Sequence, residues 1–162
     1  MRFSGLIIKR PAHKLLSGFT LLLCMIITPC LHGDELKPFT SDGCSMFPDG
    51  SLYDNTLWLS CCMAHDLAYW QGGSYEQRLA ADIELKLCVT RLGEPVLGKL
   101  MLAGVRLGGS PYLPSTFRWG YGWSFPRSYA PLSQAELVMV RNQMLQQGLT
   151  PPSLTGKPDL NQ

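Results

Sequence analysis

The residues of this chain that are best suited to chemistry lie in the stretch CCMAHDLAYW, residues 61–70. Two adjacent cysteines precede the pair His65-Asp66, and Tyr69 follows four residues after the histidine. Thiolates and imidazoles bind zinc, whereas a histidine oriented by a carboxylate is a common general base. The stretch is therefore compatible with a structural zinc site, a metal-dependent phosphohydrolase of the HD type, or a His-Asp hydrolase held by disulfides.

The number and placement of potential metal ligands argue against the structural zinc site and the phosphohydrolase of the HD type. A zinc site would combine His65 with three cysteine thiolates, but Cys61 and Cys62 would point about 100° apart on one helix and cannot easily face one ion. The chemistry of the HD type needs several histidines, and His65 is the only one after His32. The sequence therefore favours the His-Asp hydrolase.

The second carboxylate of that hydrolase would be Asp82. Two helices joined at Gly72-Gly73 should pack as an antiparallel hairpin. In such a hairpin His65 and Asp82 lie at nearly the same height, about as far from the link on either side. Cys61 and Cys88 also lie near one level, and a bridge between them would fix the register that brings Asp82 to His65.

This arrangement would make a usable site for hydrolysis. His65 could deprotonate a water molecule while Asp82 accepts the other N–H of the imidazole and fixes its tautomer. Asp66 should point toward the loop at residues 42–50, where it could bind a hard cation together with backbone carbonyls. Such a cation would polarise a carbonyl group and stabilise an oxyanion.

Residues 1–33 predict export. Four basic side chains and no acidic one accompany an apolar run at residues 15–28, and a polar exit follows. This pattern is typical of a signal peptide, and the run is short for a membrane span, which needs about 20 apolar residues. An uncleaved N-terminal anchor is the alternative. We therefore expect a secreted, periplasmic or otherwise extracytoplasmic protein.

The cysteines that follow residue 33 predict two disulfides. Four of the six cysteines remain, and an even number in a small exported chain is typical of a cystine framework. A Cys61–Cys88 bridge would leave Cys62 free to tie the loop through Cys44. The same part of the chain has ten Lys and Arg against twelve Asp and Glu, a net charge of −2. Its scattered arginines do not form the dense basic patch that nucleic-acid binding requires.

The remaining patterns predict a mostly α-helical protein. Glycine, proline and serine mark a loop over residues 39–51. Capping boxes at Ser74–Gln77 and Ser133–Glu136 mark the starts of two helices. The expected helices span approximately residues 52–70, 75–92, 94–107 and 133–147.

An aromatic segment, residues 108–132, separates the last two helices. Aromatic side chains alternate there with Arg118 and Arg127, and its glycines and prolines exclude long regular elements. The segment could form a lipid-interface surface, pack over the helices or dock a protein partner. Residues 111–148 therefore comprise this aromatic loop and a C-terminal helix, and residues 149–162 are expected to be a disordered tail.

At this point the residues resemble a known family. CCMAHDLAY resembles the CC-x-x-H-D-x-x-Y signature of the secreted phospholipase A2 superfamily, and SDGCSMFPD is similar to the calcium loop of its prokaryotic branch. Asp82 stands six residues before Cys88, which is the spacing of the family's second catalytic aspartate. The resemblance covers residues 39–92. It implies a phospholipase A2-like domain over residues 34–110, in which an antiparallel two-helix core carries the calcium loop and two disulfides.

The resemblance implies calcium-dependent hydrolysis of the sn-2 ester of glycerophospholipids at a membrane surface. His65 would be the general base, Asp82 would orient it, and Tyr69 would hydrogen-bond Asp82. The implied disulfides are Cys44–Cys62 and Cys61–Cys88. The implied Ca²⁺ ligands are the carboxylate of Asp66, the carbonyls of Gly43, Ser45 and Phe47, and additionally Asp42.

A protein of another class could carry the same motifs. Ala68 and Ala81 stand where larger members of the family have a bonded pair of cysteines, and the absence of both indicates the same hairpin without that disulfide. The feature that separates the alternative is the calcium loop, which lacks the extra glycines of the animal enzymes and would leave the His-Asp pair without a cation if it did not bind one. The alternative is a catalytically inactive, phospholipase A2-like exported protein that binds a ligand or associates with the cell envelope. Residues 108–132 would then form the surface for a protein partner.

Overall fold

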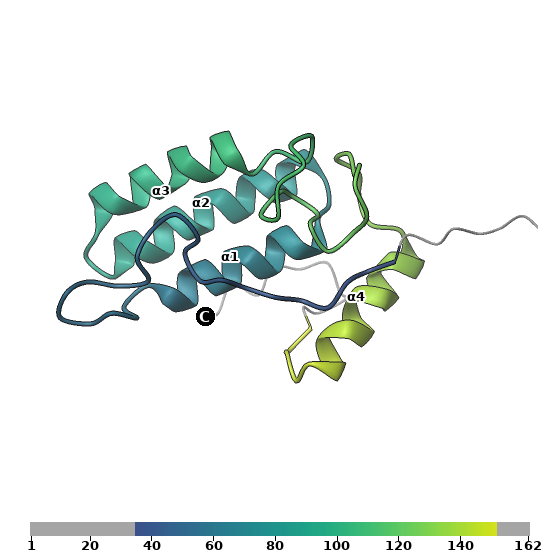
Figure 1. Ribbon diagram of the computed structural model, residues 1–162, viewed down its shortest axis with the longest axis horizontal. Helices are drawn as coiled ribbons and strands as arrows, with labels where there is room; N and C mark the ends of the chain where they lie inside the picture. Colours follow the sequence, from purple (N-terminus) through teal and green to yellow (C-terminus); the bar gives the residue numbers. More distant parts are fainter. Residues whose placement is uncertain (1–34, 152–162) are drawn as a thin grey trace, which may run out of the picture. The chain divides into compact units, whose positions relative to one another are not determined.

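The computed structural model describes residues 35–151, which fold into four helices (Figure 1). Over that range the regular structure is α-helical, without strands, and contains two disulfides, so the expected mostly α fold is confirmed. Helix α2 lies between α1 and α3. The helices are α1 (Leu59–Gln71), α2 (Tyr75–Arg91), α3 (Pro95–Gly108) and α4 (Gln134–Gln146).

The hairpin of α1 and α2 depends on the link at Gly72-Gly73. Both glycines have positive φ, 71° and 135°, which glycine adopts without the steric cost of a Cβ. Ser74 then caps α2 with the expected box, in which its hydroxyl accepts from Gln77 N–H and the Gln77 amide oxygen accepts from Ser74 N–H. The Cys61–Cys88 disulfide joins the two helices, with 5.8 Å between the Cα atoms.

Helix α1 begins at Leu59, seven residues later than the expected start near residue 52. The preceding residues form turns because polar side chains satisfy the backbone locally: Ser51 Oγ accepts from Asp54 N–H, and Asp54 Oδ1 accepts from Thr56 N–H. Leu52 is fully exposed at the tip of these turns and has nothing to pack against. Local hydrogen bonding therefore prevails over the apolar periodicity.

Helix α3 packs closely against α2 through a glycine. A Cβ at Gly98 would lie 2.7 Å from the backbone oxygen of Lys86, so only glycine allows this approach. Gly98 and Met101 are the buried residues of α3. Met101 belongs to the first core, which also contains Cys44, Trp58, Cys61, Cys62, Leu85 and Val89. Val96, Leu100 and Leu107 remain exposed, so the apolar stretch 96–107 is only partly core.

The aromatic segment packs over the end of the hairpin with its tryptophans. Trp119 and Trp123 are almost fully buried, and their indole N–H groups donate to the carbonyl oxygens of Gly73 (2.9 Å) and Gln71 (2.7 Å). Trp123 and Trp70 form a second core with α4. Of the three interpretations of residues 108–132, packing over the helices therefore holds for both tryptophans.

The predictions made for the two ends of the chain concern mostly residues that the structure does not describe. The signal peptide or anchor at 1–33 lies wholly outside, as does the tail from residue 152 onward. Leu149, the first residue of the expected disordered tail, packs instead against the second core and donates its N–H to Met144 O. Between residues 35 and 151, no helix combines the length and apolarity that crossing a membrane requires.

Gly122 offers a test of the packing between the aromatic segment and α1. A Cβ there would lie 2.5 Å from Trp70 Cδ1 and 2.7 Å from the Trp70 backbone oxygen. Because Trp70 is fully buried, Gly122→Ala is expected to lower the free energy of unfolding by about 1–3 kcal/mol in urea titrations.

The matched control is Gly104→Ala, where the nearest atom is 3.6 Å from the added Cβ. This change in a helix interior should leave stability equal or raise it by about 0.5–1 kcal/mol. Equal stabilities of the two variants would contradict the proposed contact of Gly122 with Trp70.

Candidate functional site

The structure brings His65 and Tyr69 of α1 together with Asp82 of α2, and all three side chains are buried. His65 Nε2 lies 2.9 Å from Asp82 Oδ1, and the Tyr69 hydroxyl donates to the same oxygen at 2.7 Å. Asp82 has no exposed surface and His65 is 8% exposed. Because ionised Asp82 only accepts hydrogen bonds, Nε2 carries the proton and Nδ1 keeps a lone pair that can act as a base.

Two arginines hold the other oxygen of Asp82, and sequence reasoning missed both. Arg106 Nη1 of α3 donates to Asp82 Oδ2 at 2.7 Å, and Arg78 Nε of α2 lies 3.7 Å from that atom. Arg78 Nε also donates to the Tyr69 hydroxyl at 3.0 Å. The i,i+4 spacing of Arg78 and Asp82 was a readable signal, whereas the contact with Arg106 depends on how α3 packs.

These partners keep Asp82 ionised. Burial by itself would raise the pKa of Asp82, but hydrogen bonds from His65, Arg106 and Tyr69 outweigh it and hold the pKa below the ordinary value. Burial and the nearby charge of Asp82 raise the pKa of Tyr69, so its hydroxyl stays protonated and available as a donor. The site thus has a carboxylate that favours its charged form, hydrogen-bonded to the histidine.

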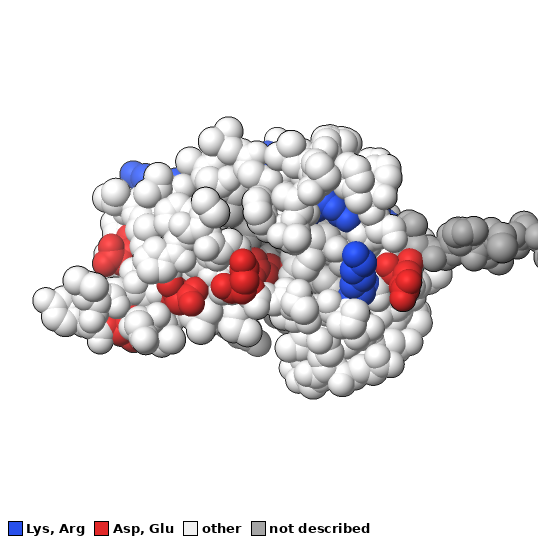
Figure 2. Space-filling view, viewed as in Figure 1, with Lys and Arg blue, Asp and Glu red and all other residues white. Residues whose placement is uncertain are grey.

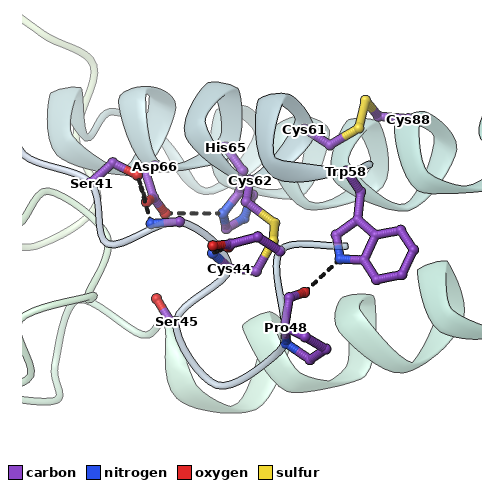
Figure 3. Close-up of a disulfide and its surroundings, with 12 residues drawn as sticks. Ser41, Cys44, Ser45, Pro48, Trp58, Cys61, Cys62, His65, Asp66 and Cys88 are labelled. Atoms are coloured by element: carbon purple, nitrogen blue, oxygen red, sulfur yellow. Dashed lines mark hydrogen bonds and ion pairs between the residues drawn. A yellow bond between two sulfur atoms is a disulfide. The ribbon is translucent and has the colours of Figure 1, made fainter. Parts of the chain in front are cut away.

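The loop that was expected to bind calcium is tied to α1 by the Cys44–Cys62 disulfide (Figure 3). With Cys61–Cys88, this is the pairing that the resemblance implies, and it leaves the four described cysteines without a thiolate for zinc. Gly43 and Ser45 have positive φ, 76° and 53°. The Asp49 carboxylate accepts the N–H of Cys44 at 2.8 Å and so fixes the turn from inside.

Asp66 points from α1 to this loop, as expected. Its Oδ2 accepts the Ser41 hydroxyl at 2.6 Å, and its Oδ1 lies 4.0 Å from His65 Nδ1 (Figure 3). Burial raises the pKa of Asp66 to about 6, with a smaller contribution from Asp42; the Ser41 hydrogen bond and His65 oppose the shift. Asp66 is therefore a partly desolvated carboxylate next to the free nitrogen of the histidine.

The five expected calcium ligands lie on one loop and helix but line two cavities. Asp42 and Asp66 line a polar cavity of about 200 Å³ with Ser41 and Tyr121. Gly43, Ser45 and Phe47 instead line the larger cavity, which also contains His65. Among residues 35–151, no group of three or more His, Cys, Asp or Glu side chains could hold a metal. The available ligands are therefore two carboxylates and backbone oxygens, and an all-oxygen set is compatible with Ca²⁺.

The larger cavity has a volume of about 370 Å³ and an apolar wall. His65 and Tyr69 form its polar end, and α3 forms much of the opposite side. Three of its large apolar lining side chains are substantially exposed: Met46 at 85%, Leu107 at 81% and Phe117 at 44%. Figure 2 shows mostly uncharged surface over α3 and acidic side chains gathered nearer the loop. The cavity can accept an apolar chain and present a polar group to His65.

No protein-family model, curated protein or solved structure matches the chain. The chemistry of the site is therefore inferred from the contacts of His65, Asp82 and Asp66 themselves. Those contacts define a fixed histidine base beside a desolvated carboxylate, at one end of an apolar cavity.

Asp66 should cost the folded protein stability. Because its pKa is raised from 3.8 to about 6, the folded state resists ionisation that the unfolded chain undergoes freely. Asp66→Asn is therefore expected to raise the free energy of unfolding by roughly 1 kcal/mol near pH 7.5 in the presence of a chelator. The difference should shrink as the pH falls from about 6 and vanish only well below 3.8, where Asp66 is protonated in both states; urea titrations at several pH values measure it.

Asp49→Asn is the matched control in the same loop. It weakens a charge-assisted hydrogen bond to Cys44 N–H, so it should lower stability by about 1 kcal/mol. If Asp66→Asn also lowered stability near pH 7.5, the carboxylate would be better solvated or better paired than its contact with Ser41 indicates.

Proposed function

We propose that the protein is a phospholipase A2-like enzyme that hydrolyses the sn-2 ester of glycerophospholipids with the help of calcium. The observation that carries this proposal is the position of the His65 ring, which binds buried Asp82 through Nε2 and lines an apolar cavity of about 370 Å³. A base with one nitrogen fixed by a carboxylate and the other left for water is suited to ester hydrolysis. The spacing of the motifs at residues 41–49 and 61–69 supports the same class.

The chemical steps use His65 as a proton carrier. Nδ1 takes a proton from a water molecule, whose oxygen attacks the ester carbonyl and forms a tetrahedral intermediate. Asp82 stays ionised and stabilises the imidazolium through Nε2–H. His65 then returns its proton to the departing lysophospholipid oxygen, so the bond between acyl carbon and oxygen breaks and a fatty acid leaves.

The site's oxygen ligands support calcium as the cofactor. Asp66 and Asp42 would bind through carboxylates and Gly43, Ser45 and Phe47 through backbone carbonyls, in keeping with the preference of Ca²⁺ for six to eight oxygens. When bound, the ion would polarise the ester carbonyl and stabilise the oxyanion. The raised pKa of Asp66 supports this assignment, since a nearby divalent cation would offset the cost of its buried charge.

The shape of the site supports a lipid substrate. An acyl chain would occupy the apolar cavity, and the exposed side chains of Met46, Leu107 and Phe117 would meet the surface of a phospholipid membrane. Two disulfides suit an oxidising compartment, in keeping with export through residues 1–33. We therefore propose that the enzyme acts outside the cytoplasm.

Replacing the base should abolish turnover. With phospholipid vesicles labelled in the sn-2 chain, the oxidised protein is expected to release fatty acid in calcium and not in chelator. His65→Gln should lower the rate by at least about 10²-fold, because general base catalysis contributes about 10²–10⁴.

Calcium should raise the thermal unfolding midpoint of the wild type and of His65→Gln, but not that of Asp66→Asn, because a cation that binds the folded state stabilises it.

The folded state of each variant is checked by circular dichroism and by the absence of free thiols. Release that persists in His65→Gln would refute the mechanism. A folded wild-type protein that neither binds calcium nor releases fatty acid would instead indicate an inactive, exported phospholipase A2-like binding or envelope-associated protein.

A further inference from the structure

We propose that Arg106 is a positioning residue, which holds Asp82 by Oδ2 so that Oδ1 faces His65. The inference rests on the proposed function for its catalytic consequence, while the orientation of the histidine ring can be measured independently. It concerns the polar network behind the base, which no motif of the chain pointed to.

The two oxygens of Asp82 have separate sets of partners. Oδ1 accepts from His65 Nε2 at 2.9 Å and from the Tyr69 hydroxyl at 2.7 Å. Oδ2 accepts from Arg106 Nη1 at 2.7 Å, with Arg78 Nε at 3.7 Å. A carboxylate can turn about its terminal bond, and donors on one oxygen alone would permit that. Donors on both oxygens fix its plane.

Arg106 is itself held in place by aromatic contacts. Its Nη2 donates to the Tyr75 hydroxyl at 3.0 Å, and the guanidinium lies 5.2 Å from the centre of the Tyr75 ring. The Tyr75 ring in turn packs edge-on against Tyr129. The Arg106 guanidinium therefore joins α3 to the start of α2, where Tyr75 contacts the aromatic segment, and its Nη1 donates to the Asp82 carboxylate.

Arg78 has a different part in the network. It is 3% exposed and donates to the Tyr69 and Tyr129 hydroxyls and to the carbonyls of Val105 and Arg106. These bonds tie α2 to α3, so substituting Arg78 would break the packing of the helices. The Arg106 side chain is 26% exposed, and within residues 35–151 it donates hydrogen bonds to Asp82 and Tyr75. Arg106 is therefore the member of the pair that can be replaced while the hairpin stays folded.

The consequence for catalysis is the tautomer of His65. If Asp82 turns, Oδ1 no longer meets Nε2–H, and the imidazole can move its proton to Nδ1, the atom that must accept a proton from water. Substrate contacts in the apolar cavity are unaffected, because Arg106 does not line it. Loss of Arg106 should therefore lower kcat and leave KM nearly unchanged.

The test compares Arg106→Gln and Arg106→Lys with Arg91→Gln. Arg91 pairs with Glu84 on the surface of α2 and is remote from Asp82, so it controls for the loss of an arginine from an ion pair. The oxidised full chain is labelled with ¹⁵N-histidine, and the His65 signals are assigned by their loss in His65→Gln. Nitrogen chemical shifts near pH 8.5 report the tautomer, and vesicle assays report kcat and KM.

Wild type and Arg91→Gln are expected to show one tautomer with the proton on Nε2. Arg106→Gln should show a mixture of tautomers and a kcat about tenfold lower, with KM within about twofold. Arg106→Lys should keep the single tautomer and recover most of kcat, since one charged donor to Oδ2 suffices. Arg106→Gln that matched Arg91→Gln in both measurements would overturn the proposal.

Two further outcomes are also decisive. If Arg106→Gln does not fold, Arg106→Lys decides: a single tautomer supports the proposal, and a mixture in a folded lysine variant refutes it. If the wild type shows no turnover, the proposed function fails by itself. The nitrogen shifts of the same variants still establish or refute the role of Arg106.

Discussion

A carboxylate without exposed surface is the constraint on which this structure depends. Asp82 is ionised inside a helical core, and an unpaired charge there would cost several kcal/mol. Each of the three packed helices supplies a partner for it: His65 and Tyr69 from α1, Arg78 from α2 and Arg106 from α3. The three helices therefore have to pack so that each one places a hydrogen-bonding or charged partner against Asp82. The contacts that hold the helices together are also those that position His65.

The two aspartates beside His65 are in opposite electrostatic situations. Asp82 has donors on both oxygens, which hold its pKa below the ordinary value. Asp66 has the Ser41 hydroxyl as its hydrogen-bond donor, and burial raises its pKa to about 6. A carboxylate that orients a base must remain charged, whereas one that awaits a cation pays a desolvation cost until the cation arrives. This difference in environment supports the roles proposed for the two aspartates, and it does so independently of any motif.

Much of the hairpin could be predicted from local sequence signals. The Gly72-Gly73 link and the capping box at Ser74 define the turn and the start of α2, because glycine conformations and caps act within a few residues. The Cys61–Cys88 disulfide and the meeting of His65 with Asp82 followed from helical register, whereas the Cys44–Cys62 pairing was implied by the resemblance. The start of α1 was placed wrongly, because the hydrogen bonds of Ser51 and Asp54 satisfy the backbone without a helix.

The contacts that could not be predicted are those between elements far apart in the chain. Arg106 reaches Asp82 only because Gly98 lets α3 approach α2 closely, and no spacing in the sequence encodes that distance. The same holds for the aromatic segment, where composition left three interpretations open. The burial of Trp119 and Trp123 depends on carbonyl oxygens at the hairpin link that happen to face them.

The separation of Trp58 from Trp70 and Trp123, which lie in different cores, has an optical consequence. Trp58 lies in the first core among the cystines, with its indole N–H on the Pro48 carbonyl of the loop. Trp70 and Trp123 lie in the second core, which contains no cysteine among its described residues. Because disulfides quench indole emission, Trp58 should contribute less to the intrinsic fluorescence of the oxidised protein than the tryptophans that lie away from the cystines. Opening the disulfides would then brighten Trp58 and make the loop beside the histidine visible in the spectrum.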